Sequence, residues 1–447
     1  MDGKALYQTL NKILDTQQMW ELFFFFAHST LTENPYSILV DIAFREEIGL
    51  LPYQSTETNS EIYPFLLIGT NLGIPLETVR EIFKFAYGIF MKIRQNHVQN
   101  SSEITSSIEE TIRLLKQSTR CLMLLNPDFH SAANTRKKLI ADNFLDPIEE
   151  LKLLDLILTF PKHTKNSTVW YHRKWVISKV ISLDHSGHLT RWKNEILIAR
   201  RVAELYPKNY YAWTYRHWII TQLSIGAKQF LDEELEDMKT WIETNVSDHS
   251  GFHHRQRCLV KMSQLYNENV IDFCGISRRD LLGMIVEKRM ETARIDESLA
   301  FLWFEEIQLT KGLILRYPGH ETLWYHLRFL SFTWKWLNAA GYIYHLKDSD
   351  IEVIRSDEEE LSGLLKAWPD DQSEIEFARH CMQKIDVLQL DDSCEVHDNL
   401  VKQKRYALSY ELWISELYCI SNDDVKTLIS KLADIIPESN YYGSRKL

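Results

Sequence analysis

The chain has 447 residues, of which 45% are apolar and 12% aromatic, so it can fill a substantial folded core and is not expected to be disordered. Its formal net charge of −11, from 62 acidic and 51 basic residues, argues against nucleic acid as a partner. None of the six cysteines forms a Cys-x-x-Cys pair, which is typical of reduced thiols in the cytosol.

Residues 1–118 are predicted to form an N-terminal helical cap. Segments 79–93 and 104–115 have the apolar period of helices. The apolar run 20–27 contains Glu21 and is far shorter than the roughly 20 residues of a membrane-spanning helix, so no membrane span is expected. Glycine is scarce, and no segment keeps an alternating β pattern for long, which favours an all-α fold.

One phrase recurs within residues 119–330: an aromatic residue and a proline, followed by a helix with Trp-x-x-Arg. Weaker copies begin at Pro127 and Val246, which gives five repeats. Such a repeat indicates units that bury their apolar faces only by stacking on one another. The tryptophan and arginine positions, with their replacements, are Ala133, Arg136, Trp170, Arg173, Trp213, Arg216, Phe252, Arg255, Trp324 and Leu327.

Each repeat is predicted to be an antiparallel helix pair. The proline ends the first helix and can open the second, because it disfavours the helical conformation in the residue before it. A first helix with one buried stripe is predicted from the spacing of Trp303, Ile307, Thr310, Ile314 and Tyr317.

On the second helix, the spacing of three places the tryptophan and the arginine on one face. A buried arginine needs hydrogen-bond acceptors. We therefore expect Arg173, Arg216 and Arg255 to hold carbonyl groups or a carboxylate of the adjacent unit.

Two regions depart from the regular period. After the fourth arginine position the step is 72 residues, near twice the earlier steps of 37 to 43, so residues 262–310 are either an unrecognised unit or a helical insertion. Residues 331–447 are predicted as C-terminal helices with an acidic exposed connection at 348–376. A degenerate last repeat is predicted at 405–413, with Glu411 in the arginine position.

The segment from Tyr206 to Arg216, Tyr-Pro-Lys-Asn-Tyr-Tyr-Ala-Trp-Thr-Tyr-Arg, resembles the repeat of protein prenyltransferase α subunits. The resemblance implies a right-handed superhelical crescent of antiparallel helix pairs around a β subunit. The β subunit would hold zinc and geranylgeranyl diphosphate, and this chain alone would bind no metal or other cofactor. The implied reaction transfers a geranylgeranyl group to a cysteine of a protein substrate, and no activity is expected without the β subunit.

Within that family, four segments resemble the α subunit of a type III geranylgeranyltransferase: 47–52, 124–129, 246–253 and 317–324. For this branch the resemblance implies the β subunit that is shared with Rab geranylgeranyltransferase. It also implies a Golgi SNARE that already carries a farnesyl group as the protein substrate. The chain would then act in the cytosol, near Golgi membranes.

The lysine that contacts the diphosphate in the family matches Lys208, and the neighbouring tyrosine matches Tyr210. These two are the candidate catalytic residues, because a cation there would stabilise the charge that grows on the leaving diphosphate. From the residues alone, Lys208 could also be an exposed lysine at a helix start and Tyr210 a packing residue. Asp248 and His249 stand where other α subunits often have asparagine, so they are candidates for the mouth of the substrate site.

Two alternatives stay open. His249 and His253 lie four residues apart beside Asp248 and could share a metal ion, but the segment lacks a third ligand at a standard spacing. The main alternative function is a non-enzymatic helical-repeat scaffold that binds a protein partner on its concave face. The Lys-Asn-Tyr phrase favours the enzyme subunit, because a scaffold does not need a lysine there.

Overall fold

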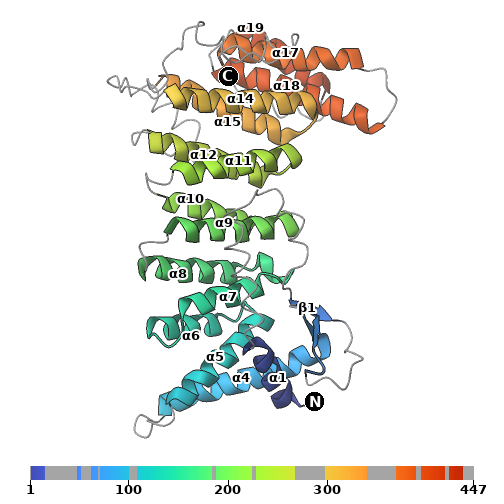
Figure 1. Ribbon diagram of the computed structural model, residues 1–447. Coiled ribbons are helices and arrows are strands. Elements are labelled where there is room, and N and C mark those ends of the chain that lie inside the picture. Colours follow the sequence, from blue (N-terminus) through green and yellow to red (C-terminus); the bar gives the residue numbers. More distant parts are fainter. Residues whose placement is uncertain are drawn as a thin grey trace. The chain divides into compact units, whose positions relative to one another are not determined.

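The fold of the chain is almost entirely helical (Figure 1). The computed structural model describes residues 2–15, 48–51, 62–68, 71–99, 108–183, 188–223, 228–266, 297–339, 369–388, 394–417 and 422–435. Contacts divide the chain into an N-terminal unit, Met1–Ile219, and a C-terminal unit, Ile220–Leu447. The predicted all-α class of stacked helix pairs is confirmed, while the curvature and handedness of the crescent stay predictions. None of the described helices is long and apolar enough to cross a membrane.

The N-terminal unit begins with a small sheet as well as helices. Its first elements are α1 (Gly3–Asp15), β1 (Ile48–Leu51), β2 (Leu66–Ile68), β3 (Asn71–Pro75), α4 (Leu76–Gln99) and α5 (Ile108–Leu125). Strand β3 is central, parallel to β1 and antiparallel to β2. The purely helical cap predicted for residues 1–118 is therefore wrong in this respect, because strands of three to five residues are too short for an alternating pattern to stand out.

The repeat helices of the N-terminal unit follow α5 in close succession. They are α6 (His130–Ala141), α7 (Pro147–Ile157), the short 3-10 helix η1 (His163–Lys165), α8 (Ser167–Leu183), α9 (His188–Leu205) and α10 (Tyr210–Gln222). Helix α7 shows why the sequence starts a helix where it does: the Asp146 carboxylate accepts the N–H of Ile148 at 3.0 Å, and Pro147 takes the first helical position. Helix α7 packs on α8, and α6 packs on both α5 and α8.

The C-terminal unit contains seven described helices. They are α11 (Lys228–Thr244), α12 (His249–Tyr266), α14 (Glu297–Arg316), α15 (Glu321–Ala339), α17 (Asp371–Leu388), α18 (Cys394–Leu417) and α19 (Asn422–Ile435). Helices α11 and α12 form one pair and α14 and α15 the next, while α18 packs against α15, α17 and α19.

The insertion predicted at residues 262–310 is wrong at both ends. Residues 262–266 complete α12, and residues 297–310 belong to α14, the first helix of the last clear repeat. The predicted stripe of that helix is buried, including Trp303 and Ile307. The rest of the predicted insertion lies outside the described residues.

The C-terminal region also differs from the prediction. The end of the predicted acidic connection, residues 371–376, belongs to helix α17. Glu374 of this helix is fully buried, whereas the prediction placed it in an exposed segment. Much of that connection lies outside the described residues. The degenerate repeat at 405–413 lies inside the continuous helix α18, where Glu411 accepts a hydrogen bond from Arg379 at 2.8 Å.

Candidate functional site

A buried carboxylate on the first helix of one pair receives the arginine from the second helix of the preceding pair. The carboxylate supplies the hydrogen-bond acceptors and the negative charge that a buried arginine needs where water cannot reach it. Such a partner was expected because the arginine lies beside a buried tryptophan. The ion pairs are Arg136 with Glu150, Arg173 with Glu195, and Arg255 with Glu306, at N–O distances of 2.5–2.9 Å. Arg216 is also buried, with its guanidinium 5.5 Å from the ring centre of Trp213.

The residue before the arginine position bonds to the carboxylate of its own pair. The bonds join His172 to Glu150 at 2.6 Å, Tyr215 to Glu195, His254 to Glu234 at 2.6 Å, and His326 to Glu306 at 2.9 Å. These carboxylates could not be recognised from the repeat phrase, because they lie 14 to 51 residues from the arginines that they bind. The recurring histidine or tyrosine before the arginine position was the available signal.

These contacts make the stability of the fold depend on pH in the acid range. Burial by itself raises the pKa of Glu150 and of Glu306, but the facing arginine and histidine outweigh it and lower each pKa to about 2. Such a carboxylate stabilises the fold above its ordinary pKa of 4.5, and this contribution is lost as the pH falls towards 2. We expect the thermal midpoint to fall over this range, and less steeply in Glu150→Gln. Equal slopes in the two proteins would contradict this account.

The last arginine position holds Leu327, and the positive charge comes from a different helix. Lys311 of α14 forms an ion pair with Glu374 of α17 at 2.7 Å, and both side chains are fully buried. The hydroxyl of Tyr410 donates to the same carboxylate at 2.5 Å, as the histidine or tyrosine does in the other pairs. The carboxylate is therefore neutralised although the repeat arginine is missing.

The aromatic positions of the repeat are buried and tie each helix to its turn or to a neighbouring helix. The indole N–H of Trp170 donates to the carbonyl of Thr164 at 2.7 Å, and that of Trp324 to Gln403 at 3.1 Å. Trp213 and Phe252 are also buried. The structure therefore gives these residues a packing role.

The turn before α10, residues 206–209, holds Lys208 in a left-handed conformation with φ of 61°. We call this segment the lysine turn. A residue with a Cβ is strained there by roughly 1 kcal/mol or more. The position after the proline in the last repeat is Gly319, with φ of 86°. A glycine therefore meets the same demand in one repeat, whereas the lysine turn keeps an exposed lysine at an energetic cost.

Hydrogen bonds from the preceding repeat hold the lysine turn in place. The ammonium of Lys165 donates to the carbonyl of Pro207 at 3.2 Å. The side-chain amide of Asn209 donates to the carbonyl of Thr164 at 2.9 Å, and its oxygen accepts the N–H of Ala212 at 3.2 Å. Asn209 thus caps α10, whose free N–H groups face the same turn.

Lys165 stands directly before the capping asparagine of α8, as Lys208 stands before that of α10. This second lysine was not predicted from the sequence. It precedes Asn166, whose side-chain oxygen accepts the N–H of Val169 at 3.2 Å and so caps α8 as Asn209 caps α10. Three extra residues between Pro161 and Trp170 disguised this copy. The Lys-Asn pair directly before each helix was the signal that could have found it.

The other predicted site residues are placed differently. Tyr210 follows the lysine turn, is 69% exposed and meets Tyr211 edge-on at 5.6 Å. Asp248 accepts the N–H of Ser250 at 3.1 Å and the indole N–H of Trp241 at 3.0 Å, which gives it a capping role at the start of α12. The ring of His249 lies 6.2 Å from that of Tyr325. Asp248 and His249 belong to the C-terminal unit, and Lys208 and Tyr210 to the N-terminal unit.

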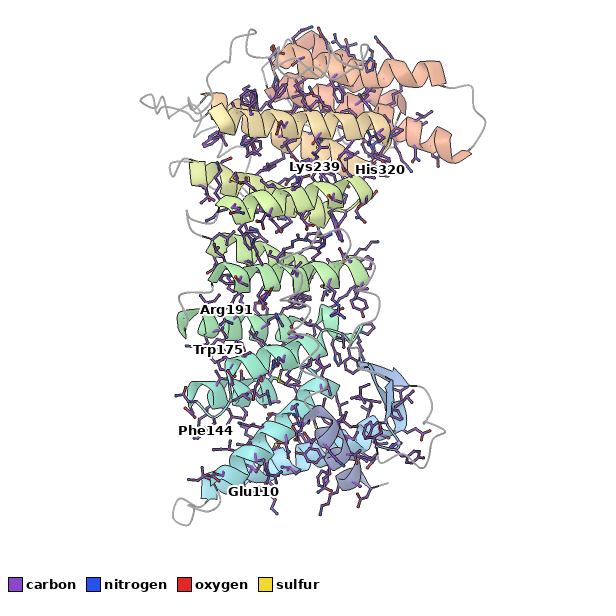
Figure 2. All side chains as sticks on the ribbon, viewed as in Figure 1. Glu110, Phe144, Trp175, Arg191, Lys239 and His320 are labelled. Atoms are coloured by element: carbon purple, nitrogen blue, oxygen red, sulfur yellow. The ribbon has the colours of Figure 1, made fainter. Side chains whose placement is uncertain are left out.

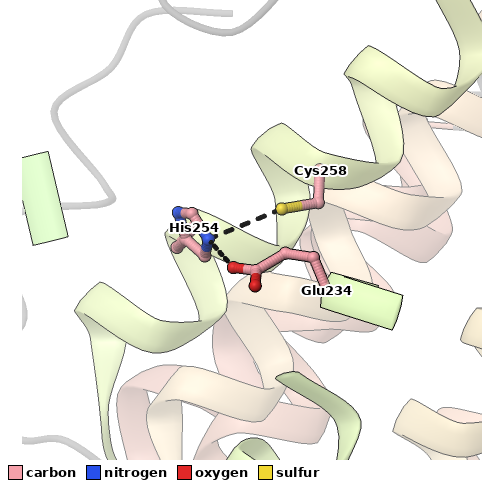
Figure 3. Close-up of side chains that lie close together, drawn as sticks. All are labelled: Glu234, His254 and Cys258. Atoms are coloured by element: carbon pink, nitrogen blue, oxygen red, sulfur yellow. Dashed lines mark hydrogen bonds and ion pairs between the residues drawn. The ribbon is translucent and has the colours of Figure 1, made fainter. Parts of the chain in front are cut away.

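The described residues bring one group of possible metal ligands together, and it does not contain His249 or His253, the pair considered as an alternative from the sequence. Glu234, His254 and Cys258 place ligand atoms within 4.8 Å of one another (Figure 3). Their histidine and glutamate form the same buried pair as the other repeats. The thiol lies three residues after the arginine position, where other repeats carry Val176 and Leu330 in the core. The repeat therefore accounts for this cluster without a metal ion.

Helix pairs with a buried Trp-x-x-Arg staple and a rigid lysine turn define a helical-repeat protein of the prenyltransferase α-subunit type. The sequence model of the protein prenyltransferase alpha subunit repeat matches residues 147–180, 192–223, 231–262 and 303–334. These four segments coincide with the pairs α7–α8, α9–α10, α11–α12 and α14–α15. The predicted repeat that begins at Pro127 lies before the first matched segment.

Relatives support the same assignment over most of the chain. Protein prenyltransferase alpha subunit repeat-containing protein 1 of Homo sapiens is 32% identical over 328 residues, which is 68% of this chain and 77% of the relative. The protein of the same name in Danio rerio is 30% identical over 311 residues, which is 65% of this chain and 68% of the relative. The geranylgeranyl transferase type-2 subunit alpha of Saccharomyces cerevisiae is 23% identical over 267 residues, which is 58% of this chain and 72% of the relative. This chain belongs to the protein prenyltransferase α-subunit repeat family.

Proposed function

We propose that this chain is the α subunit of a heterodimeric protein geranylgeranyltransferase. Membership of the family and similarity to geranylgeranyl transferase type-2 α subunits support this role. The observation that carries the proposal is the lysine turn, where Lys208 occupies a strained backbone position that Gly319 fills in another repeat. A lysine retained at such a cost is explained by a function of its side chain.

In this role Lys208 supplies positive charge to the site of the leaving diphosphate. The ammonium stands at the start of α10, beside the N–H groups of the helix terminus, which attract anions. Charge grows on the diphosphate as its bond to the isoprenoid carbon lengthens, so these groups favour the transition state over the bound substrate. Lys165 holds the turn and brings a second cation to it. Tyr210 lines the same mouth, and Asp248 and His249 influence the choice of substrate.

Zinc and the geranylgeranyl diphosphate belong to the β subunit in this proposal. The bound zinc would supply a reactive thiolate from the substrate cysteine, while this chain contributes cations and positioning. The β subunit is the one shared with Rab geranylgeranyltransferase, and the substrate is a Golgi SNARE that already carries a farnesyl group. The complex would act in the cytosol, near Golgi membranes.

Reconstitution tests this proposal directly. The chain is mixed with the β subunit of Rab geranylgeranyltransferase, labelled geranylgeranyl diphosphate and a farnesylated Golgi SNARE. We expect a one-to-one complex and transfer of the label to a SNARE cysteine, with neither subunit active alone. A stable complex that transfers nothing to any prenylatable protein would favour the non-enzymatic scaffold instead.

A further inference from the structure

Charge is divided between the two helices of each pair in the N-terminal unit. The second helices α6, α8 and α10 contain no Asp or Glu, although the chain as a whole has 62. The first helices α5, α7 and α9 do carry acidic residues. The second helices therefore form a surface on which basic side chains have no acidic neighbours from their own helix.

Lysines on this surface lie over tryptophan rings of the same or the next repeat. The ammonium groups of Lys137 and Lys179 lie 5.7 and 5.6 Å from the ring centre of Trp175, which Figure 2 labels on α8. The ammonium of Lys174 lies 4.5 Å from the ring centre of Trp218 on α10. The same step recurs from α6 to α8 and from α8 to α10. We call Lys137, Tyr171, Lys174, Trp175, Lys179 and Trp218 the basic face.

The lysines of the basic face are positioned but not neutralised. Cation–π contacts fix each ammonium on a ring at a gain of about 0.5–1 kcal/mol. Among the described residues no carboxylate forms an ion pair with Lys137, Lys174 or Lys179. Because the lysines are already ordered, an acidic partner would lose less side-chain entropy on binding them.

We propose that the basic face binds an acidic protein segment whose carboxylates pair with these lysines. Tyr171 is 67% exposed between them and offers the aromatic contact that is typical of protein interfaces. Neighbouring helices pack roughly 10 Å apart, so an extended segment of roughly six residues at 3.3 Å each crosses from α6 to α10. This binding does not depend on the transferase role of the lysine turn.

A protein segment fits this face better than a membrane does. A surface that inserts into lipid exposes several large apolar side chains, particularly tryptophan, phenylalanine and leucine. On α6, α8 and α10 the exposed large apolar residues are tyrosines, Tyr171 and Tyr210. Trp175 lies beneath two ammonium groups and is not free to insert.

The test measures binding of a fluorescein-labelled 12-residue peptide of alternating glutamate and alanine to the full chain by fluorescence anisotropy. We expect saturable binding that the triple variant Lys137→Glu, Lys174→Glu and Lys179→Glu weakens at least tenfold. The matched control is Lys4→Glu, Lys92→Glu and Lys228→Glu, which changes the net charge equally at exposed lysines elsewhere. This control is expected to change the affinity less than twofold.

Two further measurements keep the result unambiguous. If the glutamate triple variant has a lower thermal midpoint than the parent, the corresponding glutamine variants replace it, with a weaker loss expected. Sedimentation with vesicles of phosphatidylcholine and phosphatidylserine tests whether the basic face binds a membrane instead. The proposal is overturned if both triple variants weaken peptide binding equally, or if the parent binds the vesicles through these lysines and does not bind the peptide.

Discussion

Replacing Lys208 with alanine is expected to slow a single turnover of the heterodimer by about 10- to 100-fold while leaving the complex intact. The physical reason is the loss of one charge-assisted contact to the leaving diphosphate, worth about 1.5–3 kcal/mol. Single-turnover transfer of labelled geranylgeranyl to the SNARE measures this step separately from product release. Lys208→Arg, which keeps the charge, is expected to retain more of the rate than Lys208→Ala.

The backbone of the lysine turn offers a matched comparison between two variants that both lack the ammonium. Lys208→Gly relieves the left-handed strain and Lys208→Ala does not, so the glycine variant is expected to be about 1 kcal/mol more stable than the alanine variant. Their transfer rates should be equally low. This pattern would show that the lysine is kept for its charge and at a cost in stability.

A second control is Lys162→Ala, at an exposed lysine that also follows a proline but has an ordinary helical backbone, with φ of −67°. It should leave both the rate and the stability close to those of the parent. Unchanged single-turnover rates in Lys208→Ala would remove Lys208 from the mechanism.

Local periodicity made the helix pairs predictable, whereas short strands were not. The stripe that includes Trp303 and the turns at Pro161 and Pro207 are local signals, so α8, α10 and α14 could be expected from them. The three strands within residues 48–75 are too short to show a period, and the parallel pairing of β1 with β3 joins segments that are separated in sequence.

The buried carboxylates that bind the repeat arginines could not be predicted from the repeat phrase. Each arginine position could be found by its spacing, but its acceptor lies on another helix and at a variable distance in sequence. Lys208 was identified by resemblance, while its strained backbone and its support from Lys165 appear only in three dimensions. Resemblance also suggested Asp248 as a residue of the substrate mouth, and the structure adds that its side chain caps the start of α12.

The ion pair between Lys311 and Glu374 is expected to be one of the most costly contacts to break in the C-terminal unit. Lys311→Met leaves a carboxylate buried without its cation, which costs about 3–5 kcal/mol of unfolding free energy. The double variant Lys311→Met with Glu374→Gln should lose much less than the sum of the single changes, because neither charge is left alone. Chemical denaturation of the four proteins measures this coupling.

Restoring the repeat arginine tests whether Lys311 substitutes for the side chain that Leu327 lacks. In the Lys311→Met background, Leu327→Arg is expected to recover part of the lost stability. It places a cation at the repeat position from which the arginines of other repeats bind the carboxylate of the next helix pair. In the parent, Leu327→Arg should destabilise, since it adds a second buried cation to a pair that is already neutral. Lys402→Met, at an exposed lysine of the same unit, should change the unfolding free energy by less than about 0.5 kcal/mol. If Lys311→Met proves as mild as Lys402→Met, Glu374 does not need this lysine.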